Sequence, residues 1–566
     1  MPGSPADPPA AAVAAETHAR GARDAGGRGA LLVGTGILLS RILGLVRERV
    51  FAHYFGSSAA AAAFRAAQRI PNFLQNLLGE GVLSASFIPV YAELLAKGDE
   101  EEADRLAGTI FGLLALVTGV LVALGVTFTP FLMDAVASGF EGQSRELTLV
   151  LLRIAFPGTG LLVMSAWCLG ILNSHRRFFL SYAAPVVWNA LQIAAMIALG
   201  RERGLDSLAV WLTWATVAGA LAQLVVQLPT ALRLLGRFRP ALSLMRESAR
   251  RVLRSFGPVV VARGVVQLSA YVDMEFASLI SERAFAVLAQ AQILYLIPVS
   301  LFGMSVSAAE LPEMSREQGT PEEVAQAVRE RINRGSARIA FFVVPSAAAL
   351  LVLGDVVGGT LLQTGRFTPA DVRFLWYVLI GATLGLVAAT QGRLYASAFY
   401  AFKDTRTPLL FAVTRVALAA ALAYWAALRL PGQLGIPREI GAAGITACAG
   451  LAAWLEFLLL RRALSRRIGP SGIPAGSLLK LWAAAAVAAA AGLGIKAALA
   501  WWRGPVPGAE GEWRGMVLPM PAMNTVLTGA LVLGVFGVLY FAITAVMGNE
   551  QSRAVLGRVL RRRRRA

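Results

Sequence analysis

The chain has few residues of the kinds that build metal centres, disulfides or soluble catalytic sites. Among its 566 residues are 2 cysteines and 3 histidines, and only 15% are charged, against about 25% in soluble domains. Cys168 and Cys448 lie far apart in apolar segments, which fits neither a disulfide framework nor a metal-ligand spacing. No Ser/His/Asp, Walker or zinc spacing occurs either. We therefore expect no cofactor, no metal site and no catalytic residue, and predict that the protein is not an enzyme.

Apolar residues are abundant instead, at 56% of the chain, and they recur in long unbroken stretches from Ala30 onward. About 20 helical residues cross a bilayer core of about 30 Å. Continuous rather than alternating apolar runs exclude a membrane β-barrel. The sequence therefore predicts an all-α polytopic membrane protein with 14 transmembrane helices. The predicted spans are 30–52, 61–95, 106–133, 146–172, 179–200, 207–232, 255–280, 284–313, 337–358, 372–398, 408–428, 441–460, 477–500 and 524–547.

The formal net charge is +19, which in a soluble protein would suggest a nucleic-acid partner. Here the arginines lie between apolar runs, and Lys and Arg concentrate in every second connection. The positive-inside rule then places both termini in the cytoplasm and requires an even number of spans. We predict a multi-pass protein of the cytoplasmic (inner) membrane that does not bind nucleic acid.

A faint internal repeat divides the chain. Ile70-Pro71 in span 2 recurs as Ile297-Pro298 in span 8, 227 residues later, and the basic loops after spans 4 and 10 fall at almost the same offset. Six spans per copy would give both copies one orientation, as in transporters built from parallel repeats. The predicted organisation is a disordered cytoplasmic tail (1–29), an N-terminal six-helix bundle (30–240), a C-terminal six-helix bundle (241–470), spans 13 and 14 (471–548) and a basic cytoplasmic tail (549–566).

Charged residues inside the first spans are the strongest functional signal, because a charge at membrane depth normally faces a cavity or a partner. In span 1, Arg41 and Glu48 are seven residues apart and share a helix face, whereas Arg47 points elsewhere. Both arginines are candidate ligand-binding residues. Reaching to the membrane interface is the alternative role for either side chain.

Span 2 carries a polar stripe on an otherwise apolar helix. Pro71 and Gly79 flank part of this stripe and predict a kink there. Kinked polar helices commonly line transporter cavities. The alternative is a polar clamp between spans 1 and 2. The stripe consists of Arg69, Asn72, Asn76 and Glu80.

An excess of cations in this half suits an anionic ligand, and guanidinium groups bind phosphate oxygens in a bidentate fork. We therefore predict a phosphate or pyrophosphate ligand. The second half is mixed in sign. Asp273 or Glu275 could couple transport to a cation or proton, or pair internally with Arg263 or Arg415.

Several strings together resemble the MurJ (MviN) family of lipid II flippases, within the multidrug/oligosaccharidyl-lipid/polysaccharide exporter superfamily. The resemblance runs over most of the chain, and the order and spacing of the strings make it specific. The matching strings are Ser40-Arg41-x-x-Gly44-x-x-Arg47, Phe55-Gly56, Arg69-Ile70-Pro71-Asn72, Gly79-Glu80-Gly81, Leu172-Asn173-Ser174, Gln227-Leu228-Pro229, Gln363 to Thr368, and Phe399 to Pro408.

This resemblance implies a fourteen-helix flippase with a cationic central cavity that takes the substrate pyrophosphate, in which Arg41, Arg47 and Glu80 carry over. The implied substrate is a lipid-linked disaccharide-pentapeptide pyrophosphate, moved by alternating access for cell wall synthesis. Membrane lipid and cell-wall synthesis proteins are the other expected partners, and we expect a monomer.

The chain departs from the family pattern in span 8, where members carry an arginine and this sequence reads Ala291-Gln292-Ile293. Arg263 or Arg415 could replace that cation. Span 11 offers Thr414 and Arg415 where some relatives hold sodium near a span 7 aspartate, which Asp273 matches. Four alternatives stay open: a flippase for another polyprenyl-pyrophosphate-linked sugar, a polytopic glycosyltransferase acting on the same lipid, an exporter of cationic drugs, and a cell-wall scaffold that has lost transport.

Overall fold

The structure is a computed structural model, and it describes residue 36 and residues 38–242, 246–503 and 523–553. The side chains of Glu80 and of most residues from 258 to 270 also lie outside the described part. The predicted tail at 1–29 falls outside it as well, and so does the predicted basic tail (549–566) from residue 554 onward. Every element named within the described residues is a helix, so the all-α prediction is confirmed.

The described chain forms two compact units. Unit 1 comprises the chain up to Val50 together with Ile70–Thr129 and Val150–Arg263; unit 2 comprises Phe51–Arg69, Pro130–Leu149 and everything from Gly264. Two short segments of the first half of the sequence thus belong to unit 2. The predicted boundaries of the two six-helix bundles stay a prediction.

Unit 1 is built from long helices that pack around an aromatic and aliphatic cluster centred on Trp167. The Trp167 indole donates to the carbonyl of Ala107, 3.1 Å away, which ties two of these helices together. Its helical segments are residues 38–50, α3 (Arg69–Leu78), α4 (Glu80–Ala96), α5 (Glu100–Thr127), α7 (Gly142–Ser174), α8 (Phe178–Leu199), α9 (Leu205–Leu234) and the first part of α10 (Glu247–Ile280).

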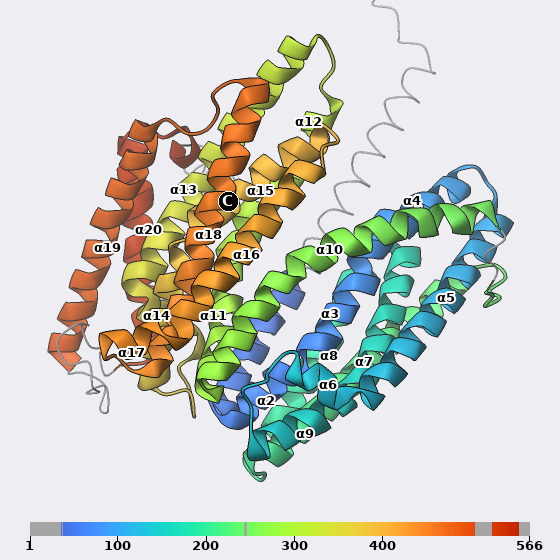
Figure 1. Cartoon of the computed structure of the whole chain (residues 1–566), viewed down its shortest axis with the longest axis horizontal. Helices are drawn as coiled ribbons and strands as arrows, with labels where there is room; N and C mark the ends of the chain where they lie inside the picture. The colour runs from blue at the N-terminus through green and yellow to red at the C-terminus, as the bar shows by residue number, and fades with distance from the viewer. Residues whose placement is uncertain (1–35, 37, 243–245, 504–522, 554–566) are drawn as a thin grey trace, which may run out of the picture. The chain divides into compact units, whose positions relative to one another are not determined.

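In unit 2, α18 packs against α14, α15 and α16, and α13 packs against α14, α15, α19 and α20 (Figure 1). Thr320 and Thr368 open α13 and α14 with capping boxes, each followed by a proline. Its helices are α2 (Ala59–Ala67), α6 (Thr129–Asp134), the end of α10, α11 (Glu282–Pro298), the π-helix η1 (Val299–Met304), α12 (Ser305–Arg316), α13 (Pro321–Leu362), α14 (Pro369–Thr383), α15 (Leu386–Ala401), α16 (Arg406–Leu428), α17 (Leu430–Leu434), η2 (Arg438–Ile440), α18 (Gly441–Ile468), α19 (Ala475–Arg503) and α20 (Thr525–Val546).

Eleven helices over the described residues are long and apolar enough to cross a membrane, and a twelfth span results if the bent pair α14 and α15 is counted as one. The helix at 38–55 adjoins residues outside the described part, and many side chains of α10 lie outside it. A polytopic membrane architecture is thus confirmed, whereas the count of 14 stays a prediction.

The predicted kink in span 2 is confirmed. Helix α3 ends at Leu78, and Gly79 separates it from α4 with a backbone conformation outside the helical region. A Cβ atom at Gly79 would lie 2.4 Å from the carbonyl oxygen of Gln75, closer than any side chain tolerates. Glycine therefore permits the bend at the polar stripe.

The loop before α2 is docked on unit 2 by backbone contacts. Gly56 has φ +59°, and a Cβ there would lie 2.5 Å from the carbonyl oxygen of Arg366. The amide of Arg366 donates to the carbonyl of His53 at 2.9 Å, and the His53 ring shares a 2.8 Å hydrogen bond with the Thr364 hydroxyl. Two strings that the sequence placed more than 300 residues apart therefore form one contact.

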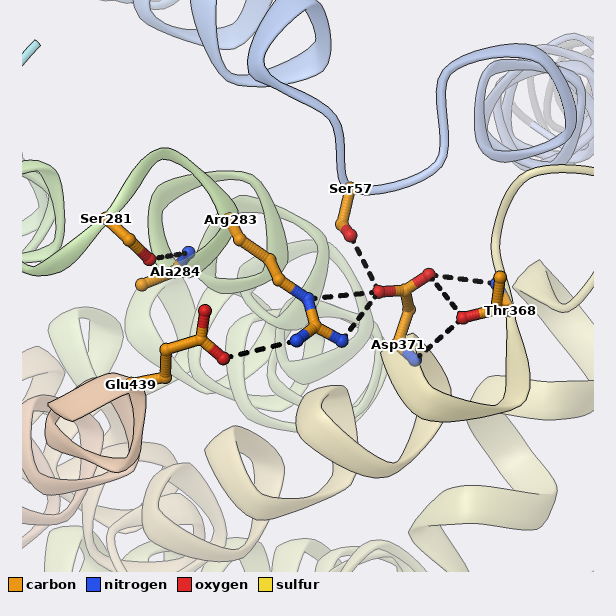
Figure 2. A network of polar contacts seen from close by, with 7 residues as sticks. All are labelled: Ser57, Ser281, Arg283, Ala284, Thr368, Asp371 and Glu439. Atoms are coloured by element: carbon orange, nitrogen blue, oxygen red, sulfur yellow. Dashed lines mark hydrogen bonds and ion pairs between the residues drawn. The ribbon is translucent and has the colours of Figure 1, made fainter. Parts of the chain in front are cut away.

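A polar network fastens the same loop (Figure 2). The Ser57 hydroxyl donates to Asp371 at 2.7 Å, and the Arg283 guanidinium reaches Asp371 at 2.9 Å and Glu439 at 3.2 Å. Asp371 also accepts from the amide and hydroxyl of Thr368. Sequence reasoning assigned no role to Arg283, Asp371 or Glu439. Together they explain why residues 51–69 belong to unit 2.

Candidate functional site

Unit 2 contains a cavity of about 230 Å³ that is lined by residues of six of its helices. Its polar lining comes from different helices, because single polar residues interrupt otherwise apolar faces of α10, α11, α15, α16 and α18. A polar cavity inside an apolar helix bundle is the usual form of a transporter substrate or ion site. The polar lining residues are Asp273, Gln292, Tyr295, Arg393, Arg415 and Thr446.

Arg415 is neutralised within this site. Its Nε atom lies 3.1 Å from a carboxylate oxygen of Glu456 on α18, and both side chains are about a quarter exposed or less. The sequence left open whether Arg415 serves as an internal pair or in ion coupling, and the structure places it in a pair with Glu456.

Arg393 on α15 differs from Arg415. Its side chain is exposed to the cavity, and it has no ion-pair partner among the residues that the structure describes. An unpaired guanidinium lining a cavity can form a bidentate contact with a phosphate. The predicted set of site residues did not include Arg393.

Arg69, at the start of α3, contacts a residue of the cavity lining. Its guanidinium donates to the side-chain oxygen of Gln292 at 2.8 Å and lies 5.8 Å from the ring centroid of Tyr271, whose hydroxyl donates to the Arg69 carbonyl. Gln292 stands directly before Ile293, where the family resemblance led us to expect an arginine. The structure thus brings a cation from another helix to this position of α11.

The two predicted acids of α10 have separate environments. Asp273 is half-buried and lines the cavity, whereas the Glu275 carboxylate accepts from the amide and hydroxyl of Ser138. Thr414 donates to the carbonyl of Leu410 in its own helix. Asp273 and Arg415 are therefore the two of these residues that share the cavity.

In unit 1, Arg41 and Arg47 lie on the helix at 38–55. Arg41 is exposed. Arg47 forms a 2.6 Å ion pair with the buried Glu48, and its guanidinium lies 5.0 Å from the ring centroid of Trp188. The sequence placed Glu48 on the face of Arg41 and Arg47 on another, but the flexible Arg47 side chain reaches its neighbour.

The remaining predicted residues lie on α3, α4 and α10. Asn72 and Asn76 are exposed on α3, one helical turn apart. Glu80 is the first residue of α4, and Arg263 belongs to α10. The side chains of Glu80 and Arg263 lie outside the described part of the chain.

The family model and similar known relatives point to the same protein family. The family described as "Lipid II flippase MurJ" matches residues 51–505. A lipid II flippase MurJ of Burkholderia cenocepacia is 30% identical over 529 residues, covering 92% of this chain and 97% of the relative. A probable lipid II flippase MurJ of Rhizobium meliloti is 30% identical over 438 residues, covering 76% and 78%.

Solved structures agree on the fold. The inward closed conformation of a lipid II flippase MurJ aligns with a TM-score of 0.71 at 22% identity, over 91% of this chain and 98% of that one. An inward-facing multidrug resistance transporter of the MATE family, in the MOP superfamily, aligns with a TM-score of 0.58 over 76% of this chain. Because both identities are low, these alignments show similarity of fold only.

Proposed function

We propose that this chain, which belongs to the lipid II flippase MurJ family, moves lipid II from the inner to the outer leaflet of the membrane for peptidoglycan synthesis. The chain is a lipid II flippase of a polytopic all-helical fold. It works by alternating access and makes or breaks no covalent bond, so it is not an enzyme.

The observation that carries this proposal is an arginine in the cavity lining of unit 2 that has no ion-pair partner among the described residues. This arginine is Arg393, and Arg69 donates a hydrogen bond to Gln292 of the same lining. A pyrophosphate needs charge-assisted hydrogen bonds to leave water, and planar guanidinium groups supply them in pairs.

Arg393 takes the role that an arginine of span 8 has in the family pattern. The sequence suggested Arg263 or Arg415 for this role. Arg415 is the weaker choice because Glu456 already neutralises it. Arg393 lines the same cavity as Gln292 and has no acidic partner among the described residues. Asp273 remains available to bind a coupling cation or proton.

The test of function is complementation. Expression of this chain in a bacterium depleted of its own lipid II flippase should restore growth and return lipid II to the outer leaflet. The measurement is growth together with accessibility of lipid II to an externally added enzyme that cleaves it. Failure of a chain that reaches the membrane at normal level would contradict the proposal and favour a scaffold role.

We further propose that the chain lies in the cytoplasmic membrane with both termini inside. Gln433, in the short helix α17, and Gln318, after α12, are both exposed and fall in connections assigned to opposite sides. The variant Gln433→Cys should react with an impermeant maleimide in intact cells, whereas Gln318→Cys should react only after permeabilisation. The parent chain is the background control, because Cys168 and Cys448 are buried. The reverse labelling pattern would invert the topology.

A further inference from the structure

The turn between α7 and α8 forms a second pocket, wholly within unit 1 and of about 500 Å³. Three arginines line it, two from the turn and one from the end of α9. Phe178, Phe179, Leu180 and Leu234 supply apolar walls. The three arginines are Arg176, Arg177 and Arg233.

An arginine of this turn has a backbone conformation that is unfavourable for residues other than glycine. Arg176 has φ +59°, in the left-handed region that favours glycine. Its amide donates to the carbonyl of Asn173 at 3.0 Å, and the Arg177 amide donates to the carbonyl of Leu172 at 2.8 Å. This pattern is a Schellman motif at the end of α7, in which an arginine takes the usual place of glycine.

The same motif recurs after α15 at Lys403, 227 residues later, with φ +60°. The Lys403 amide donates to the Tyr400 carbonyl and the Asp404 amide to the Phe399 carbonyl, both at 2.9 Å. Arg176 and Lys403 are the two non-glycine residues with positive φ over the described part of the chain. The offset equals that of the Ile-Pro repeat, so the two turns are equivalent positions of the two copies.

The copies differ at the next residue. Asp404 occupies in the second copy the place that Arg177 has in the first. Its carboxylate accepts from the amide and hydroxyl of Thr407 at 3.0 and 2.9 Å and from Arg467 at 2.6 Å. These hydrogen bonds, that from the Thr407 amide above all, hold the pKa of Asp404 below its ordinary value. The second turn therefore carries its own anion.

The first turn has an arginine, not an acid, at the position that matches Asp404. None of its three arginines has an ion-pair partner among the described residues. Helix α8 also begins there without a side-chain cap, so its first amides point positive partial charge toward the same end. Three exposed arginines and an uncapped helix start therefore give this pocket a positive potential that suits an anionic ligand.

We propose that this pocket binds the phosphate group of an anionic membrane phospholipid. The pocket lies at the ends of apolar membrane-spanning helices, and Phe179, 49% exposed, lines it together with the arginines. Arginine recognises phosphate through its planar fork, and basic pockets at the membrane surface bind lipid headgroups. An apolar side chain beside the phosphate site suits an acyl chain rather than a free ion. The positive-inside rule assigns this turn to the inner leaflet.

The test is titration of the purified full chain in non-ionic detergent with phosphatidylglycerol, followed by native mass spectrometry. Phosphatidylglycerol should be retained and phosphatidylcholine should not. The variant Arg177→Asp copies the second turn, which shows that this motif accommodates aspartate. It should weaken phosphatidylglycerol binding about tenfold or more, because a charge-assisted contact becomes a repulsion.

A matched pair separates binding from folding. Arg176→Gly and Lys403→Gly should both raise the melting temperature, because glycine relieves the left-handed conformation. Only Arg176→Gly should lose phosphatidylglycerol. Unchanged binding by Arg177→Asp, or equal retention of phosphatidylcholine, would overturn the proposal. Displacement of the lipid by an equal concentration of inorganic phosphate would assign the pocket to a free anion and overturn the lipid assignment.

Discussion

Replacing Arg393 with alanine is expected to reduce lipid II transport by at least tenfold while the chain reaches the membrane at normal level. A hydrogen bond to a charged group contributes about 1.5–3 kcal/mol, and each 1.4 kcal/mol corresponds to about tenfold. Arg393 is exposed to the cavity and has no internal partner among the described residues, so its loss leaves no buried acid unpaired. The measurement is complementation together with transport in vesicles of purified protein.

The controls distinguish substrate binding from general damage. Arg393→Lys should recover part of the activity, because lysine keeps the charge without the planar fork. Arg462→Ala removes an exposed arginine of α18 outside the cavity lining and should leave transport unchanged. Full activity of Arg393→Ala would contradict the role of Arg393, and another residue of unit 2 would then have to supply the substrate-binding cation.

Replacing Arg415, in the same cavity, should have a different effect from replacing Arg393. Its alanine variant leaves Glu456 without its 3.1 Å partner, and an unpaired acid inside the membrane is unfavourable whether or not substrate binds. Combining Arg415→Met with Glu456→Gln should therefore recover more activity than Arg415→Ala alone. No second change of this kind should rescue Arg393→Ala.

The fold was predictable from sequence to the extent that the bilayer dictates it. Apolar stretches long enough to cross a membrane have one structural solution, the helix, because no water satisfies the backbone. The break at Gly79 was predictable for a similar reason, since glycine and proline act on the local backbone. The count of spans depends on where helices bend, as at α14 and α15, and local composition leaves that open.

The partners of the charged residues were not predictable. A charge in an apolar helix shows that a partner or cavity exists, but the rotation of that helix and its neighbours is set by packing. Glu456 lies 41 positions after Arg415, and no periodicity joins them. The Ser57 and Asp371 contact likewise joins a loop to a helix cap 314 positions away. Family strings marked both regions without indicating that they touch.

Replacing Lys496 with methionine is expected to destabilise the protein by about 3–5 kcal/mol, because breaking a buried ion pair leaves its partner uncompensated. Lys496 on α19 forms an ion pair with Asp355 on α13, and the two side chains are 0% and 2% exposed. Trp376 covers the ammonium, with its ring centroid 5.8 Å away. The two residues are 141 positions apart, and nothing in the sequence singles out Asp355 as the partner of Lys496. Unfolding of the purified chain by denaturant measures the change.

Lys480→Met is the matched control, because Lys480 is an exposed lysine of the same helix and its loss should change stability little. The double variant Lys496→Met with Asp355→Asn should recover most of the loss, since removing both charges leaves no buried ion. Helices α19 and α20 also pack on α13 through other residues. If the Lys496–Asp355 pair were not needed for this packing, the single variant would keep both helices in place. If Lys496→Met unfolds like the parent chain, the pair does not hold α19 in place, and apolar packing against α13 alone must do so.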